Sequence, residues 1–241
     1  MAEIVYPPVI RLARVLFKAL DYRFRIEGAE RVPRTGGAVL VSNHISYLDF
    51  IFAGYAAFPA RRLVRFMAKK EVFEHPVSGP LMRAMHHIPV DRSAGAGAYG
   101  HAVRALRAGE VVGVFAEATI SRSFMLKDLK NGAARMAAEA GVPLIPVILW
   151  GTQRLWTKGR PRRLLQRHLP ITILVGEPMH PTPEDDMTVV TKRLRERMAE
   201  MLDRAQRTYP EIPEGVWWQP RHLGGTAPSP EEAGEADARR G

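Results

Sequence analysis

A histidine and an aspartate five positions apart, His44 and Asp49, have the residue types and spacing that suit acid–base chemistry. They directly follow the apolar run Ala38–Val41, which is typical of a buried strand. An aspartate that accepts a hydrogen bond from one ring nitrogen fixes the tautomer of the histidine and leaves the other nitrogen free to take a proton. Because the chain has no cysteine, an acyl-cysteine intermediate is excluded, and we expect the proton to come from a substrate hydroxyl.

Two further segments place charged side chains directly after short apolar runs. Ile88–Val90 ends at Asp91 and Arg92, and the planar fork of an arginine suits a phosphate dianion. Val111–Phe115 leads into a polar loop that ends at a helix beginning near Gly132, whose positive end also favours an anion. The candidate binding residues after this run are Glu117, Thr119, Arg122, Lys127 and Lys130. Taken singly, the first of these segments is better explained as a surface ion pair of Asp91 with Arg92, and the second also fits an ordinary solvated loop.

Together the segments resemble the glycerophospholipid acyltransferase family, typified by the 1-acylglycerol-3-phosphate O-acyltransferases. The family motif Asn-His-x-Ser-x-x-Asp is matched in the segment 43–49, with His44 and Asp49 at its reactive positions. The second block, a strand ending in an arginine, is matched by Val90–Arg92, and the apolar fourth block by Val142–Val147. The resemblance runs from about Phe24 to Met179, with the four blocks in the family order.

The third block, typically Phe-Pro-Glu-Gly-Thr-Arg in the family, is altered in this chain. Ala116, Ala118 and Ile120 stand where the family has proline, glycine and arginine, while Glu117 and Thr119 match. Alanine disfavours the left-handed backbone angles that glycine adopts, so we expect the loop to follow a different path. The absent arginine is replaced by Arg122, Lys127 or Lys130, and the sequence leaves open which of the three.

The resemblance implies an O-acyltransferase of phospholipid biosynthesis that moves a fatty acyl group from acyl-CoA, or acyl carrier protein, to a glycerol hydroxyl. The implied reaction converts 1-acylglycerol-3-phosphate to phosphatidic acid, with glycerol 3-phosphate or another lysophospholipid as alternative acceptors. His44 is the implied base and Asp49 its orienter, and we interpret Ser46 as a cap of the helix that begins at Asp49. The implied substrate-binding residues are Arg92, Glu117, Thr119, Arg122, Lys127 and Lys130. We expect no metal and no cofactor besides the co-substrate acyl-CoA.

Two rival functions remain open at this point. A hydrolase would use the same histidine and aspartate to activate water, and a non-catalytic basic protein would only bind membranes. The net charge of +10 and the pI near 10.3 favour anionic partners. We do not expect nucleic acid among them, because the basic residues are spread along the chain and no recognised reader motif is present.

Apolar strands alternate with helices along the chain, which predicts an α/β fold with a mixed, mostly parallel sheet flanked by helices. We expect a single acyltransferase domain over 23–213. It would be preceded by an amphipathic membrane-interface helix over 1–22 and followed by a C-terminal extension over 214–241. The extension is rich in Gly, Pro, Ala and Glu from about 224, so we expect disorder there.

The segment Pro8–Tyr22 has apolar residues at helical spacing and Arg11, Arg14 and Lys18 on one face. Such a helix either lies in a membrane interface or packs on the core with a solvated cationic stripe. No run approaches the roughly 20 apolar residues that span a bilayer, and the N-terminus lacks a secretory signal pattern. We therefore expect peripheral or monotopic attachment to an anionic membrane surface on the cytoplasmic side of the cell membrane.

Overall fold

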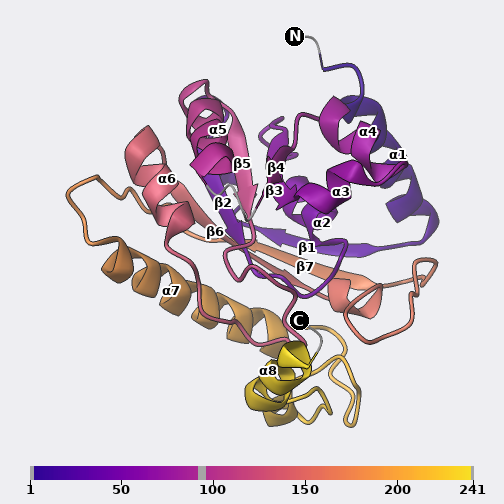
Figure 1. The fold of residues 1–241 in the computed structure, drawn as a ribbon. Coiled ribbons are helices and arrows are strands. Elements are labelled where there is room, and N and C mark those ends of the chain that lie inside the picture. Colours follow the sequence, from indigo (N-terminus) through magenta and orange to yellow (C-terminus); the bar gives the residue numbers. More distant parts are fainter. Residues whose placement is uncertain (1–2, 92–95, 240–241) are drawn as a thin grey trace.

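A seven-stranded sheet lies between two layers of helices in the computed structural model, which describes residues 3–91 and 96–239 (Figure 1). The strands are β1 (Arg23–Glu27), β2 (Ala38–Ser42), β3 (Val64–Lys69), β4 (Ile88–Val90), β5 (Val111–Val114), β6 (Leu144–Trp150) and β7 (Pro170–Val175). The α-helices are α1 (Tyr6–Ala19), α2 (Asp49–Ala56), α3 (Lys70–Glu74), α4 (Ser78–Ala84), α5 (Ala96–Arg107), α6 (Gly132–Ala140), α7 (Met187–Arg207) and α8 (Pro230–Ala238). Short 3₁₀ turns are η1 (Ala29–Arg31), η2 (Thr152–Arg154) and η3 (Arg221–Leu223).

The sheet is mixed and mostly parallel, which confirms the predicted fold class. Its strand order is β1-β7-β6-β2-β5-β3-β4, and β6 and β7 form the antiparallel pair. The central strand β2 pairs in parallel with β5 on one side and β6 on the other. Because parallel strands end at the same edge of a sheet, the segments that follow β2, β5 and β6 meet there.

Both faces of the sheet are buried, which explains why β2 is apolar without alternation. Val39 and Val41 face a core covered by α5, α6 and α7, whereas Ala38 and Leu40 face a second core under α1 and α2. All five residues of β2 are buried. A strand held in this way gives the segment after Ser42 a rigid starting point.

Helix α1 packs on the second core with one face and exposes apolar side chains on the other. Tyr6 donates a hydrogen bond to Val64 O at 2.9 Å, and Phe17 stacks on Phe52 of α2 with ring centroids 5.3 Å apart. Leu12 and Val15 are 70% and 66% exposed. None of the helices in the described ranges combines the length and the apolar character needed to cross a bilayer.

The C-terminal extension corrects our expectation of disorder from about residue 224. Helix α8 forms there and begins with a capping box between Ser229 and Glu232, next to Pro230 in the first turn. Ala227 and Ala233 are buried. Composition alone predicted disorder, but the capping box and these two small buried side chains let the segment fold into α8 (Figure 1).

Candidate active site

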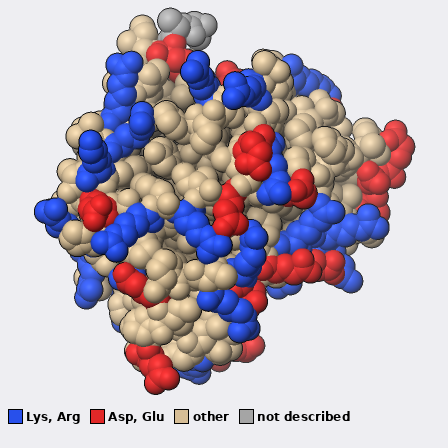
Figure 2. All heavy atoms as spheres, turned by 180° about the vertical axis from the view of Figure 1, so that it is seen from behind, with Lys and Arg blue, Asp and Glu red and all other residues tan. Residues whose placement is uncertain are grey.

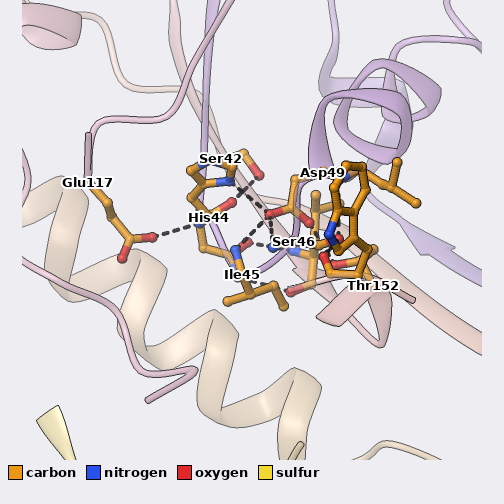
Figure 3. A network of polar contacts seen from close by, with 11 residues as sticks. Ser42, His44, Ile45, Ser46, Asp49, Glu117 and Thr152 are labelled. Carbon is orange, nitrogen blue, oxygen red and sulfur yellow. Dashed lines mark hydrogen bonds and ion pairs between the residues drawn. The ribbon is translucent and has the colours of Figure 1, made fainter. Parts of the chain in front are cut away.

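The carboxylate of Asp49 lies at the centre of a compact hydrogen-bond network at the carboxyl edge of the sheet (Figure 3). Asp49 is fully buried in the first turn of α2. Its Oδ2 atom accepts from Ile45 N–H at 2.6 Å and Ser46 N–H at 2.7 Å, and lies 3.0 Å from His44 Nδ1. Its Oδ1 atom accepts from the Thr152 hydroxyl at 2.6 Å. Burial of a carboxylate destabilises the fold unless its oxygens accept hydrogen bonds, and both oxygens of Asp49 do so.

His44 therefore has one ring nitrogen engaged and the other available. Since Asp49 Oδ2 accepts, Nδ1 carries the hydrogen and Nε2 keeps its lone pair. Within the described residues, Nε2 has no hydrogen-bond partner, and the side chain is 20% exposed. The imidazole stacks on Phe115 with ring centroids 4.2 Å apart, which fixes the plane of the ring. This geometry suits a base that accepts a proton through Nε2.

Two residues tie the segment after β2 to the end of β6. The Asn43 side chain donates to Leu149 O at 3.0 Å and accepts from Leu149 N–H at 2.8 Å, so it continues the strand pairing beyond β2. Gly151 adopts φ +100°, and a Cβ there would lie 2.3 Å from Pro170 O. The turn at this glycine brings Thr152 to Asp49.

The loop after β5 holds the backbone of His44 from the opposite side (Figure 3). Glu117 Oε1 accepts from His44 N–H at 2.8 Å, and Ser121 N–H donates to His44 O at 2.7 Å. Glu117 Oε2 accepts from Lys127 N–H at 2.9 Å. We expected Glu117 to contact substrate, but its side chain is buried and both of its oxygens bind backbone groups. The structure therefore makes Glu117 a positioning residue.

The loop keeps a left-handed backbone angle at the altered position of the third block. Ala118 has φ +61°, although alanine disfavours this region and we expected a different path. Ala118 N–H donates to Phe115 O at 3.0 Å, and the neighbouring Glu117 is held at both oxygens. These surrounding bonds hold the strained residue in place.

Ser46 also differs from the expectation, because it does not cap α2. Helix α2 has Leu48 at its N-cap position and no side-chain cap. Ser46 Oγ instead donates to Trp156 O at 2.8 Å, and the same carbonyl accepts from Tyr47 N–H at 3.0 Å. The serine thus joins the turn after His44 to the loop after β6.

The basic residues expected to bind substrate are brought together only in part. Arg122 and Lys127 converge on the carboxylate of Asp237 in α8, each at 2.9 Å. Thr119 Oγ1 accepts from Lys158 Nζ, which also reaches Asp237 at 3.1 Å. The side chain of Lys130 is exposed, and its backbone N–H donates to Ala116 O. Arg92 lies outside the described residues.

Four residues that the structure places at the site were not identified from the sequence. Thr152 and Lys158 lie beyond the apolar fourth block, where Gly151 and Gly159 were the only visible signs of turns. Phe115 was assigned to a strand without a role. Asp237 lay in the segment expected to be disordered.

The arrangement suits an enzyme-type site in which an oriented histidine would accept a proton from a hydroxyl or from water. It is formed by loops that follow three neighbouring strands of an α/β sheet. Across the described residues, no group of three or more His, Asp and Glu side chains is arranged to hold a metal ion.

Comparison with known families identifies the chain. The profile of the family described as "Acyltransferase" matches residues 23–150, which is more than half of the chain. The chain therefore belongs to this acyltransferase family.

Named relatives are similar over most of the chain. The chain is 27% identical over 187 residues to the 1-acyl-sn-glycerol-3-phosphate acyltransferase of Bacillus subtilis, which covers 73% of this chain and 87% of that protein. It is 35% identical over 169 residues to the 1-acyl-sn-glycerol-3-phosphate acyltransferase of Limnanthes douglasii, covering 68% of this chain and 56% of that protein. The chain thus spans about half the length of this plant relative.

The fold is also similar to a solved structure. The crystal structure of the 1-acyl-sn-glycerophosphate (LPA) acyltransferase PlsC from Thermotoga maritima matches with a TM-score of 0.69 and 23% sequence identity. The match covers 85% of this chain and 81% of that chain. At this identity the likeness establishes the fold alone.

The burial of Glu117 predicts a pH-dependent stability. Burial raises the pKa of Glu117 from 4.5 to about 7, although the N–H groups of Lys127 and His44 favour its charged form. Between these two values the folded protein holds a proton that the unfolded chain has released, so this residue's contribution to the free energy of unfolding falls as the pH rises. We expect a loss of about 3 kcal/mol from this residue between pH 4 and pH 8.

Urea denaturation of the wild type and of Glu117→Gln across this pH range measures the effect. Glutamine does not titrate, so the other groups cancel in the difference between the two proteins. The free-energy difference, wild type minus variant, is expected to fall with rising pH. Two curves that stay parallel would show that Glu117 has an ordinary pKa.

Proposed function

We propose that this chain is an O-acyltransferase that moves a fatty acyl group from acyl-CoA to the glycerol hydroxyl of 1-acylglycerol-3-phosphate. The observation that carries the proposal is the His44–Asp49 pair, with Nε2 of His44 available, within a chain of the acyltransferase family. The curated relatives are named for this reaction. Glycerol 3-phosphate and other lysophospholipids are the alternative acceptors, and acyl carrier protein is the alternative donor.

In the proposed mechanism, His44 Nε2 takes the proton of the acceptor hydroxyl as its oxygen attacks the thioester carbonyl. The carboxylate of Asp49 holds Nδ1–H and stabilises the imidazolium that forms. Collapse of the tetrahedral intermediate expels the CoA thiolate, which takes up the proton from His44. General base catalysis of this kind contributes about 10²–10⁴-fold to the rate.

An apolar cavity on the α1 and α2 side of the sheet suits part of the acyl chain of the donor. It lies between α1 and α2 and is lined by Tyr6, Val9, Phe17, Phe50, Ile51 and Gly54, among others. A row of aromatic rings leads toward it from the imidazole. Phe115 stacks on His44, Phe66 lies 5.8 Å from Phe115, and Phe50 lies 6.3 Å from Phe66, all between ring centroids. An apolar lining of this kind favours a lipid chain over water and so supports transfer rather than hydrolysis.

Replacement of His44 tests the proposal. The purified wild type is given palmitoyl- or oleoyl-CoA together with lysophosphatidic acid, glycerol 3-phosphate or other lysolipids, and the products are identified by mass. We expect His44→Ala to lower kcat by about 10²–10⁴-fold, because the attacking hydroxyl keeps its proton. His180→Ala, which removes an exposed histidine, is the matched control and should transfer at the wild-type rate.

The same assay separates the rivals. CoA release that proceeds equally well without any acceptor would identify a hydrolase. Undiminished transfer by a folded His44→Ala protein would remove His44 from the mechanism. If the wild type binds vesicles but transfers to none of the acceptors, the remaining interpretation is a non-catalytic membrane-binding protein.

For the location of the protein, we propose peripheral attachment to the cytoplasmic face of an anionic membrane through α1. The outer face of this helix combines exposed Leu12 and Val15 with exposed Arg11, Arg14 and Lys18. Such a face suits the boundary between lipid phosphates and acyl chains. Elsewhere, Figure 2 shows basic side chains on the back of the molecule dispersed among acidic and uncharged ones, which does not favour a nucleic acid strand.

Charge reversal on α1 tests this attachment. We expect Arg11→Glu, Arg14→Glu and Lys18→Glu together to weaken binding to phosphatidylglycerol-containing vesicles by at least about tenfold, since each cation near an anionic surface contributes about 1 kcal/mol. Sedimentation with vesicles measures the binding.

The matched control reverses three exposed cations of α7, Lys192, Arg193 and Arg197, and so changes the net charge equally. This control should bind vesicles considerably more tightly than the α1 variant. Equal losses in the two variants would mean that net charge, and not α1, governs attachment, and no loss in either would argue against an electrostatic interface.

A further inference from the structure

Three cations of the site surround one carboxylate from the far end of the chain. Arg122 Nε, Lys127 Nζ and Lys158 Nζ lie 2.9, 2.9 and 3.1 Å from the oxygens of Asp237. All four side chains are largely shielded from water, with 13–29% of each exposed. We call Arg122, Lys127 and Lys158 the basic cluster.

The basic cluster is built into the same loops that hold His44. Lys127 donates its backbone N–H to Glu117, which also binds the backbone N–H of His44. Lys158 follows the Trp156 carbonyl that accepts from the turn after His44, and its ammonium group also donates to Thr119. Loops on both sides of the histidine therefore bring these cations to one place.

A glycine leaves room for the arginine of the cluster. Gly159 adopts φ +71°, and a Cβ at this position would lie 2.8 Å from Arg122 Nη1. A side chain here would push against the end of the Arg122 side chain, so glycine lets the turn after Lys158 pack directly on the guanidinium. Arg122 and Lys158 both reach the same carboxylate oxygen of Asp237.

The charges of the cluster are not balanced by its present occupant. Three cations face one carboxylate, so two positive charges remain in a shielded place. A phosphate monoester carries close to two negative charges at neutral pH and offers three acceptor oxygens. Its charge and its number of acceptors fit the basic cluster better than Asp237 does.

Asp237 occupies a position that its own helix disfavours. It lies in the last turn of α8, where the helix dipole repels an anion. Burial alone would raise the pKa of Asp237, but hydrogen bonds from Lys127, Arg122 and Lys158 outweigh it and hold that pKa well below its ordinary range. The basic cluster, rather than the helix, thus accounts for the place of this carboxylate.

Helix α8 is held to the rest of the protein by few contacts, so its last turn can detach from the basic cluster. It has nine residues, of which only Ala233 is buried, and a helix of this length is marginal by itself. Its start is held by the capping box and by the ion pair of Arg221 with Glu232. Its last turn is held by Asp237, so an anion that takes the place of this carboxylate removes the contact of the last turn.

We propose that Arg122, Lys127 and Lys158 bind the phosphate monoester of a substrate, and that Asp237 of α8 occupies this site until the phosphate displaces it. The phosphate is either that of the lipid acceptor or the 3′-phosphate of CoA. This choice of substrates rests on the proposed function. Asp237 is then an intramolecular competitor that lowers the apparent affinity for the phosphate-bearing substrate.

Removal of the charge of Asp237 tests the proposal. Asp237→Asn should lower the KM of the phosphate-bearing substrate by about fivefold and leave kcat nearly unchanged. Adding Lys158→Gln to Asp237→Asn should raise that KM again, because it removes one cation of the site. Glu235→Gln is the matched control: it removes the same charge from the same helix, at an exposed residue paired with Arg239, and should behave as the wild type.

A binding measurement makes the test independent of turnover. Inorganic phosphate and glycerol 3-phosphate are titrated into each protein by calorimetry, and Asp237→Asn should bind them about fivefold more tightly than the wild type and Glu235→Gln. A fall in the KM of the acceptor alone assigns the site to the lipid phosphate, and a fall in that of acyl-CoA alone assigns it to CoA. Tighter phosphate binding by a protein that transfers to no acceptor would refute the proposed function and retain the phosphate site.

Two results would overturn the proposal. Unchanged phosphate affinity and unchanged KM values in Asp237→Asn would show that Asp237 does not compete with an anion. Weaker phosphate binding with higher KM values would show that Asp237 is a structural support of the loops.

Discussion

The site depends on one buried charge, the carboxylate of Asp49, and on the hydrogen bonds that hold it. A buried carboxylate is stable only when its oxygens are satisfied, so the groups that satisfy it must take fixed places. The turn after β2 supplies two backbone N–H groups and the imidazole of His44, and the turn after β6 supplies Thr152. The position of the histidine is thus set by the pairing of β2 with β6.

The loop after β5 is the second support, and it links the histidine to the basic cluster. Glu117 binds the backbone N–H groups of both His44 and Lys127 with its two oxygens. The left-handed Ala118 follows directly, so its strain is held by a buried and doubly bonded neighbour. Loss of the Glu117 side chain would therefore loosen the backbone of both segments.

Local signals predicted most of the fold and the centre of the site. Helix α6 begins at Gly132, where the sequence predicted its start, and the spacing of His44 and Asp49 in one turn identified the pair. Residues that join the site through tertiary packing could not be predicted from the sequence. Thr152 lies 103 positions from Asp49, and Asp237 lies 115 positions from Arg122, so no short-range pattern connects them. Composition also gave a wrong prediction of disorder at the C-terminus, because a capping box and small buried side chains stabilise α8 despite its polar sequence.

The central claim is that His44 and Asp49 act as one unit, and a double-mutant cycle on acyl transfer tests it most directly. The kcat/KM values of His44→Ala, Asp49→Asn and the double variant are compared with that of the wild type, with folding checked by circular dichroism. If Asp49 acts through His44, the double variant should be about as slow as His44→Ala alone, because losses within a unit do not add. Losses that multiply in the double variant would mean that the two residues act independently and would contradict the account.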